Sequence, residues 1–147
     1  QPAAFKVLAV DDDPAVLGAV EALVATQPIA LYTLGDPLDF WRQLEAVQPD
    51  LVMLDVDMPF LSGIELCRVL RNDMRWGAVP VLFLTARTDA DSIQRIFAAG
   101  ADDYVSKPLV GPELLGRLHN RLERTRLHRR MAELERPPGA LSREETP

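Results

Sequence analysis

The feature that most constrains this chain is a regular alternation of short apolar segments with longer segments of helical spacing. The short segments are rich in Val, Ile and Leu, which is typical of strands buried on both faces of a sheet. They are residues 5–10, 29–34, 51–54, 79–84 and 104–105. The helical segments are residues 14–25, 37–47, 62–72, 89–99 and 112–135. This alternation predicts an α/β fold in which helices cover both faces of a five-stranded parallel sheet.

Residues with helix-capping chemistry stand at the starts of the predicted helices. Asp13 and Asp36 each precede a proline, which suits the first turn of a helix because proline needs no hydrogen-bond acceptor there. Ser62 is followed three residues later by Glu65, the spacing of a capping box. These signals support the predicted order of strands and helices.

Composition excludes several classes of protein. With 147 residues, 48% of them hydrophobic, the chain is long enough to bury its own core as one globular domain. Its single cysteine, Cys67, excludes a disulfide framework and a multi-cysteine metal site, and we expect it to serve only in packing. The apolar runs are too short to span a bilayer and no secretory signal is visible. We therefore expect a cytoplasmic protein that does not contact membranes.

Charge is unevenly distributed along the chain. Residues 1–111 contain 16 acidic and 8 basic residues, whereas residues 112–147 contain 6 acidic and 8 basic ones. Within residues 117–130 there are six arginines and one glutamate. This pattern predicts an acidic body with a basic C-terminal extension, and it argues against direct nucleic-acid binding by the body.

Chemically active side chains follow several of the predicted strands. In open parallel sheets the functional crevice lies at the C-terminal ends of the strands. At or just beyond those ends stand Asp11, Asp12, Asp13, Asp55, Asp57, Thr85, Tyr104, Ser106 and Lys107. Four stretches of chain that are far apart in the sequence thus bring carboxylates, a hydroxyl and an ammonium to one edge of the sheet.

This combination of groups is suited to phosphoryl chemistry. Clustered carboxylates repel one another unless a cation neutralises them, and Mg²⁺ prefers oxygen ligands from one or two carboxylates and a phosphate. Thr85 and Lys107 offer a hydrogen bond and a positive charge to the remaining phosphoryl oxygens. An aspartate beside such an ion is a competent nucleophile toward phosphorus.

Four segments give the chain its family resemblance. Residues 7–14 (VLAVDDDP), 54–59 (LDVDMP, followed by Gly63), 84–86 (LTA) and 99–108 (AGADDYVSKP) resemble the receiver domain of two-component response regulators in order and spacing. The resemblance extends over residues 5–124. It implies a flavodoxin-like, doubly wound fold with strand order 2-1-3-4-5 and a receiver domain within residues 1–124.

The resemblance also implies a magnesium site. Asp55 would be the phosphoacceptor, and Asp11 and Asp12 would be the acidic pair that organises Mg²⁺. Asp12 and Asp55 would bind the ion directly through their carboxylates, and Asp57 through its backbone carbonyl.

A conformational switch is implied as well. Thr85 and Lys107 would hold the phosphoryl oxygens, and the Lys107–Pro108 peptide bond would be cis. Tyr104 would be a rotamer switch that swings inward when Thr85 moves toward the phosphate.

The function implied is regulatory. A histidine kinase or phosphotransfer protein would supply the phosphoryl group, and the protein would catalyse only its own phosphorylation and dephosphorylation. Phosphorylation would alter the surface formed by the helix at 89–99, the strand at 104–105 and the last helix, where a homodimer would form. This domain would bind neither nucleic acid nor membrane.

Two features of the sequence distinguish this chain within the family pattern. Position 57 is Asp where the family varies widely, and Arg87 follows Thr85 by two residues. We expect an Asp57–Arg87 pair to cover part of the acyl phosphate and change its lifetime. Leu109 stands where the family often has Phe, and we expect only a packing consequence.

Other functions remain open at this stage. The segment Asp55-Val56-Asp57 also fits a haloacid-dehalogenase-like phosphatase, although that motif should follow the first strand rather than the third. A module that acts without being phosphorylated and a stand-alone regulator are two further alternatives.

The last predicted helix is too long for a small sheet to cover. Leu115, Leu118 and Leu122 form one apolar seam that we expect to pack on the domain, and Leu127, Met131 and Leu134 form a second, out of phase with the first. We expect residues 125–136 to be a helical extension or linker, which either pairs in a dimer or is a solvated amphipathic helix, because the second seam spans barely one heptad. Residues 137–147 would be a flexible tail leading to an output module outside this chain.

Overall fold

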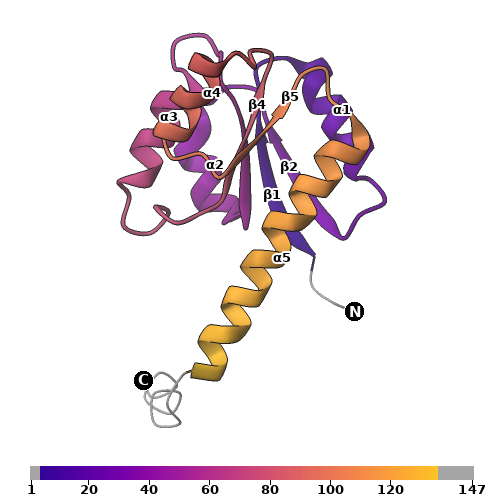
Figure 1. Ribbon diagram of the computed structural model, residues 1–147, viewed down its shortest axis with the longest axis vertical. Coiled ribbons are helices and arrows are strands. Elements are labelled where there is room, and N and C mark those ends of the chain that lie inside the picture. The colour runs from indigo at the N-terminus through magenta and orange to yellow at the C-terminus, as the bar shows by residue number, and fades with distance from the viewer. Residues whose placement is uncertain (1–3, 136–147) are drawn as a thin grey trace.

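The computed structural model describes residues 4–135. Its five strands form one parallel sheet in the order β2-β1-β3-β4-β5, which confirms the implied doubly wound fold (Figure 1). The strands are β1 (Phe5–Val10), β2 (Ile29–Leu34), β3 (Leu51–Asp55), β4 (Val81–Thr85) and β5 (Asp103–Ser106). Every residue of β3 and β4 is buried, as expected for strands covered on both faces.

Helices cover the two faces of the sheet with separate hydrophobic clusters. On one face α1 (Pro14–Val24) and α5 (Gly111–Glu135) pack against the sheet. On the other face lie α2 (Phe40–Val47), α3 (Gly63–Arg71) and α4 (Ala90–Ala98). No helix within residues 4–135 combines the length and the apolar character needed to cross a membrane.

The predicted caps are present at the helix starts. The Asp13 carboxylate accepts a hydrogen bond from the Ala15 amide at 2.9 Å. Ser62 and Glu65 form both hydrogen bonds of a capping box, each at 3.1 Å. One predicted helix is divided: a 3-10 turn at Pro37–Asp39 precedes α2.

Two predictions need correction: the start of the fourth strand and one residue of the buried row on α5. The fourth strand begins at Val81 rather than at residue 79, because Val79 donates its amide to Trp76 in a turn and Pro80 has no amide hydrogen. On α5 the buried row is Leu114, Leu118 and Leu122, while Leu115, predicted in its place, is only partly buried at the edge of the same cluster.

The C-terminal half of α5 projects beyond the body (Figure 1). Leu127, Met131 and Leu134, the predicted second seam, are exposed. The predicted tail at residues 137–147 lies outside the described residues.

Arg71 ties the N-terminal ends of β4 and β5 to α3. Its guanidinium donates hydrogen bonds to the backbone carbonyls of Gly77, Val79 and Gly100 at 2.6–3.1 Å. It also forms a 2.8 Å ion pair with Asp102, which accepts the first amide of β4. This network fixes the end of the sheet opposite to the acidic cluster.

Candidate functional site

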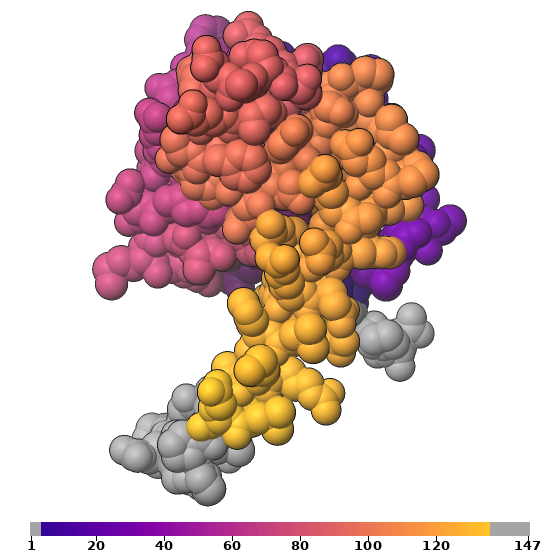
Figure 2. All heavy atoms as spheres, viewed as in Figure 1, coloured from indigo at the N-terminus to yellow at the C-terminus, as the bar shows by residue number. Residues whose placement is uncertain are grey.

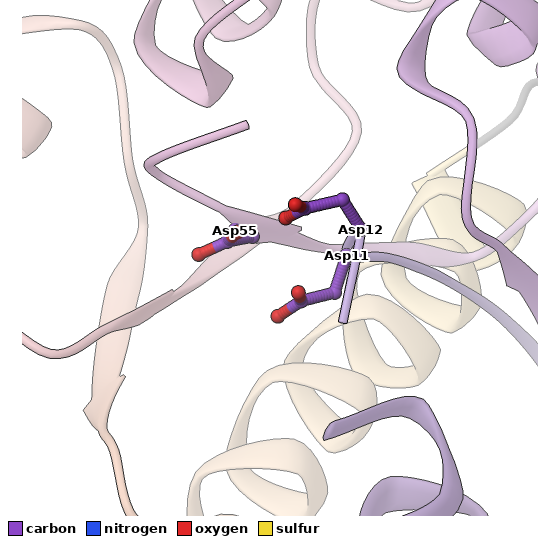
Figure 3. Close-up of side chains that lie close together, drawn as sticks. All are labelled: Asp11, Asp12 and Asp55. Carbon is purple, nitrogen blue, oxygen red and sulfur yellow. The ribbon is translucent and has the colours of Figure 1, made fainter. Parts of the chain in front are cut away.

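Three carboxylates meet at the C-terminal ends of β1 and β3. The two strands are neighbours in the sheet, so Asp11 and Asp12, which follow β1, lie beside Asp55, the last residue of β3. One carboxylate oxygen from each residue lies within 4.8 Å of the others (Figure 3). Asp11 and Asp55 are buried, whereas Asp12 is exposed to solvent. The sheet therefore brings together the acidic residues that the sequence singled out.

Lys107, just after β5, reaches across to the acidic cluster. Its Nζ donates to Asp11 Oδ2 at 2.8 Å and to Asp55 Oδ1 at 2.9 Å. One ammonium does not neutralise three carboxylates, so the ionised cluster carries a net charge of about −2. An oxygen-rich site of this charge, open to solvent at Asp12, fits a hard divalent cation such as Mg²⁺.

Burial and charge shift the pKa values of this site. Desolvation of the Asp55 carboxyl raises its pKa to about 6; the neighbouring Asp11 charge acts in the same direction, and Lys107 opposes both. Burial alone would lower the pKa of Lys107, but its hydrogen bonds to Asp11 and Asp55 raise it. Lys107 is therefore fully charged at neutral pH and Asp55 is largely ionised.

Thr85 ends β4, and its hydroxyl is bonded within its own loop. The hydroxyl donates to the Arg87 carbonyl at 3.1 Å and accepts the Arg87 amide at 3.0 Å. Lys107 donates its backbone amide to the Thr85 carbonyl at 2.7 Å, so the two loops are directly connected. Sequence reasoning could place Thr85 at the strand end but gave no sign of these hydrogen bonds.

Tyr104 in β5 is half-buried between two side chains. Its ring meets Phe97 of α4 edge-on, with the ring centroids 6.1 Å apart. The guanidinium of Arg117 on α5 lies 5.7 Å from the centre of the same ring and forms an ion pair with Asp103 at 2.7 Å. Tyr104 thus joins α4 to α5. The peptide bond at Lys107–Pro108 is cis, as the resemblance implied.

Asp57 and Arg87 face each other near the acidic cluster, as predicted. Their side chains approach to 3.7 Å, and each is 64% exposed. A small cavity of about 60 Å³, lined in part by Asp57, Thr85 and Arg87, adjoins the pair. A pair this exposed contributes little to stability, but it lines the same cavity as Thr85.

Two supporting contacts were missed by sequence reasoning. The Asp13 amide donates to Asp11 Oδ1 at 2.9 Å and so orients that buried carboxylate. A Cβ atom at Gly63 would lie 2.0 Å from the Asp55 carbonyl oxygen, so only glycine permits α3 to begin this close to the end of β3. Gly63 belongs to the motif quoted above, but its spacing alone did not reveal this close approach.

Comparison with known proteins decides the family. Residues 7–119 match the response regulator receiver domain family. The chain belongs to this family. Receiver domains of this family take part in two-component signalling, and the parallel sheet with its acidic strand ends is the architecture expected for one.

Curated relatives of this receiver domain are longer proteins. It is 45% identical to Protein RcaC of Microchaete diplosiphon over 121 residues, which are 82% of this chain and 19% of that protein. It is 37% identical to the DNA-binding response regulator MtrA of Mycolicibacterium smegmatis, covering 81% of this chain and 51% of MtrA. The receiver domain therefore spans about half, or less, of the length of these relatives.

Solved receiver structures share the fold. A response regulator from Chloroflexus aurantiacus is 30% identical, with a TM-score of 0.78, over 82% of this chain and 98% of that one. The receiver domain of a sensor histidine kinase from Pseudomonas aeruginosa, solved with a magnesium ion in its active site cleft, is 26% identical with a TM-score of 0.74. It covers 82% of this chain and 99% of that one.

Proposed function

We propose that this receiver domain accepts a phosphoryl group on Asp55 in a Mg²⁺-dependent reaction. The observation that carries the proposal is the placement of a buried Asp55 between the Lys107 ammonium and two further carboxylates. Similarity to a receiver domain solved with magnesium in its cleft supports the choice of ion. The phosphatase alternative is disfavoured because Asp55 follows β3 rather than the first strand.

The carboxylates of Asp12 and Asp55 and the backbone carbonyl of Asp57 would hold the ion, with Asp11 completing the acidic pair. When bound, Mg²⁺ would neutralise charge on the cluster and on the incoming phosphoryl oxygens. Asp11, buried and bonded to Lys107, keeps that lysine directed toward Asp55.

In the transfer step an Asp55 oxygen attacks phosphorus while the phosphorus–nitrogen bond of a phosphohistidine breaks. The bonding electron pair remains with the departing imidazole, and an acyl phosphate forms on Asp55. Lys107 stands 2.9 Å from Asp55 and supplies positive charge to the phosphoryl oxygens as they arrive. The reaction relies mainly on positioning and charge.

Phosphorylation would then change the α4–β5–α5 surface. The Thr85 hydroxyl would exchange its two hydrogen bonds to the Arg87 backbone for one to a phosphoryl oxygen. The space it leaves would admit Tyr104, whose ring would move away from Phe97 and Arg117. A two-state equilibrium of this kind is shifted because the phosphoryl group makes contacts in only one of the states.

A histidine kinase or phosphotransfer protein would be the donor, and the phosphorylated α4–β5–α5 surface would form a homodimer that α5 extends. We assign no nucleic-acid or membrane binding to this domain, and no catalytic turnover beyond its own phosphorylation and dephosphorylation. A cytoplasmic location follows from these partners.

Intact mass after treatment with acetyl phosphate and Mg²⁺ tests the proposal. We expect one added phosphoryl group, which should be absent from Asp55→Asn and from a metal-free sample. Asp57→Asn is the matched control, since it removes a neighbouring carboxylate but keeps the backbone carbonyl, and it should still be phosphorylated. Size-exclusion chromatography of the same samples should show a dimer only after phosphorylation. Lack of an adduct under all conditions would favour a module that acts without phosphorylation.

A further inference from the structure

A second cleft lies at the opposite end of the sheet from Asp55. It has a volume of about 420 Å³ and opens where β3, β4 and β5 begin, against one side of α5. Asp50 immediately precedes β3, and Asp102 immediately precedes β5. Figure 2 shows the surface recessed beside α5, where this helix leaves the body. The length of β3 separates this cleft from Asp55 by roughly 15 Å.

One face of α5 lines the cleft with basic side chains. Arg121, Arg124 and His128 are spaced three and four residues apart, so they project from the same side of the helix. Figure 1 shows that this part of α5 runs past the lower end of the sheet.

The acidic residues of the cleft are already paired with other arginines. Asp50 forms a 2.7 Å ion pair with Arg129, and Asp102 forms a 2.8 Å ion pair with Arg71. Arg75, which also lines the cleft, pairs with Glu45 at 2.8 Å. These pairs leave no carboxylate of the cleft to match the charges of the remaining arginines.

Arg121 and Arg124 are those remaining arginines. Arg121 donates to the backbone carbonyl of Asp102 at 2.6 Å, and its Nε is buried without an acceptor. Arg124 forms no ion pair with any of residues 4–135. Two positive charges, one helical turn apart, are therefore uncompensated at the edge of a cleft.

We propose that this cleft binds a small molecule that carries two adjacent phosphate groups. Guanidinium groups recognise phosphate through paired hydrogen bonds, and two of them on successive turns suit a diphosphate better than a single anion. The volume is typical of a small-molecule site and exceeds what inorganic phosphate alone needs. Pro49, Val79 and Pro80 provide an apolar wall for the rest of the ligand. The proposal does not depend on phosphorylation of Asp55.

Isothermal titration of the whole chain with inorganic pyrophosphate and with ADP, in metal-free buffer, tests this site. We expect saturable binding of one ligand per chain, with ADP binding more tightly than pyrophosphate because it also reaches the apolar wall. The Arg121→Gln/Arg124→Gln double variant should weaken binding about tenfold or more. Because Arg121 also supports the fold, Arg124→Gln alone provides a second test and should weaken binding about threefold or more.

Two controls separate this site from other sources of binding. Arg130→Gln removes the same charge from α5 outside the cleft, and it should leave affinity unchanged. Asp55→Asn should also leave it unchanged, because the acidic cluster is at the other end of the sheet. Absence of saturable binding, or an equal loss in Arg130→Gln and Arg124→Gln, would overturn the proposal. ADP binding no tighter than pyrophosphate would overturn the role of the apolar wall.

Discussion

At the residue scale, Asp55 is held in a state that costs stability. Its pKa of about 6 exceeds the ordinary value of 3.8, so between these pH values the folded chain binds more protons than the unfolded chain. The free energy of unfolding therefore falls as pH rises through that window and stays lower above it. We predict that Asp55→Asn raises the free energy of unfolding at pH 7 by about 1–3 kcal/mol.

Urea unfolding in metal-free buffer at pH 4, 5, 6 and 7 measures this effect. The free energy of unfolding of Asp55→Asn should exceed that of the original chain by an amount that grows between pH 4 and pH 6 and then levels off. Asp57→Asn, at an exposed carboxyl, is the control and should show no comparable trend. A variant no more stable than the original chain at pH 7 would contradict the prediction.

A second residue-scale prediction concerns the exposed Asp57–Arg87 pair. If it covers part of the acyl phosphate, Arg87→Ala should shorten the lifetime of that phosphate by admitting water. Exposed ion pairs contribute about 0.2–1 kcal/mol, so the change should not exceed about fivefold. Loss of phosphoryl mass over time, compared with Arg42→Ala at another exposed ion pair away from this cavity, measures it. Equal rates in the original chain and Arg87→Ala would dismiss the pair as a cover.

Much of the site could be predicted from the sequence because parallel strands deliver their C-terminal ends to one edge. That rule alone placed Asp11, Asp12 and Asp55 together and added Lys107 from the last strand. It could not place the Thr85 hydroxyl, whose partner depends on how its own loop turns. Nor could it show that the Asp13 amide orients Asp11, since a helix-capping role already accounted for Asp13.

At the element scale, Gly63 sets how closely α3 approaches the end of β3. An alanine Cβ here would lie 2.0 Å from the Asp55 carbonyl oxygen, so either α3 or the strand end must move. We predict that Gly63→Ala lowers the free energy of unfolding by about 1–3 kcal/mol or more and slows phosphorylation by displacing Asp55.

Gly116 offers the matched comparison, because a Cβ there would meet no atom within 4 Å. Gly116→Ala should raise the free energy of unfolding by about 0.5–1 kcal/mol, since alanine is favoured over glycine inside a helix. Urea unfolding and the rate of reaction with acetyl phosphate measure both variants. Similar effects of the two substitutions would show that the close approach at Gly63 is unimportant.

The existence of α5 and two of its three buried leucines, Leu118 and Leu122, could be predicted, but the burial of Leu114 in place of Leu115 could not. Adjacent helical residues differ by about 100° in direction, so Leu114 and Leu115 are equally plausible partners for Leu118 on spacing alone. The rotation of α5 about its own axis, as it packs on the sheet, decides between them, and here Leu114 is buried. This packing depends on the partners of α5, which are α1 and β5, and cannot be derived from the α5 sequence alone.

At the scale of the whole molecule, the body and the projecting part of α5 should be separable. The buried leucines of α5 end at Leu122, and beyond them the Arg129–Asp50 ion pair is the only ion pair or hydrogen bond between the helix and the body within residues 4–135. We predict that a chain ending at Arg124 keeps its free energy of unfolding to within about 1 kcal/mol. A chain ending at Arg117 loses Leu118 and Leu122 and should lose several kcal/mol. Urea unfolding of both chains measures this; an unfolded 1–124 chain would refute the prediction.

The uncovered half of α5 would amplify a small tilt of the helix into a larger displacement of its end. From Glu123 to Glu135 the helix extends for about 20 Å past its last buried leucine. A tilt of about 10° where it rests on the sheet would therefore carry its tip through about 3–4 Å. A rearrangement too small to disturb the core could thus move the C-terminal end of α5 by several ångströms. That displacement is large enough to break or form side-chain contacts with a partner packed against this end of the helix.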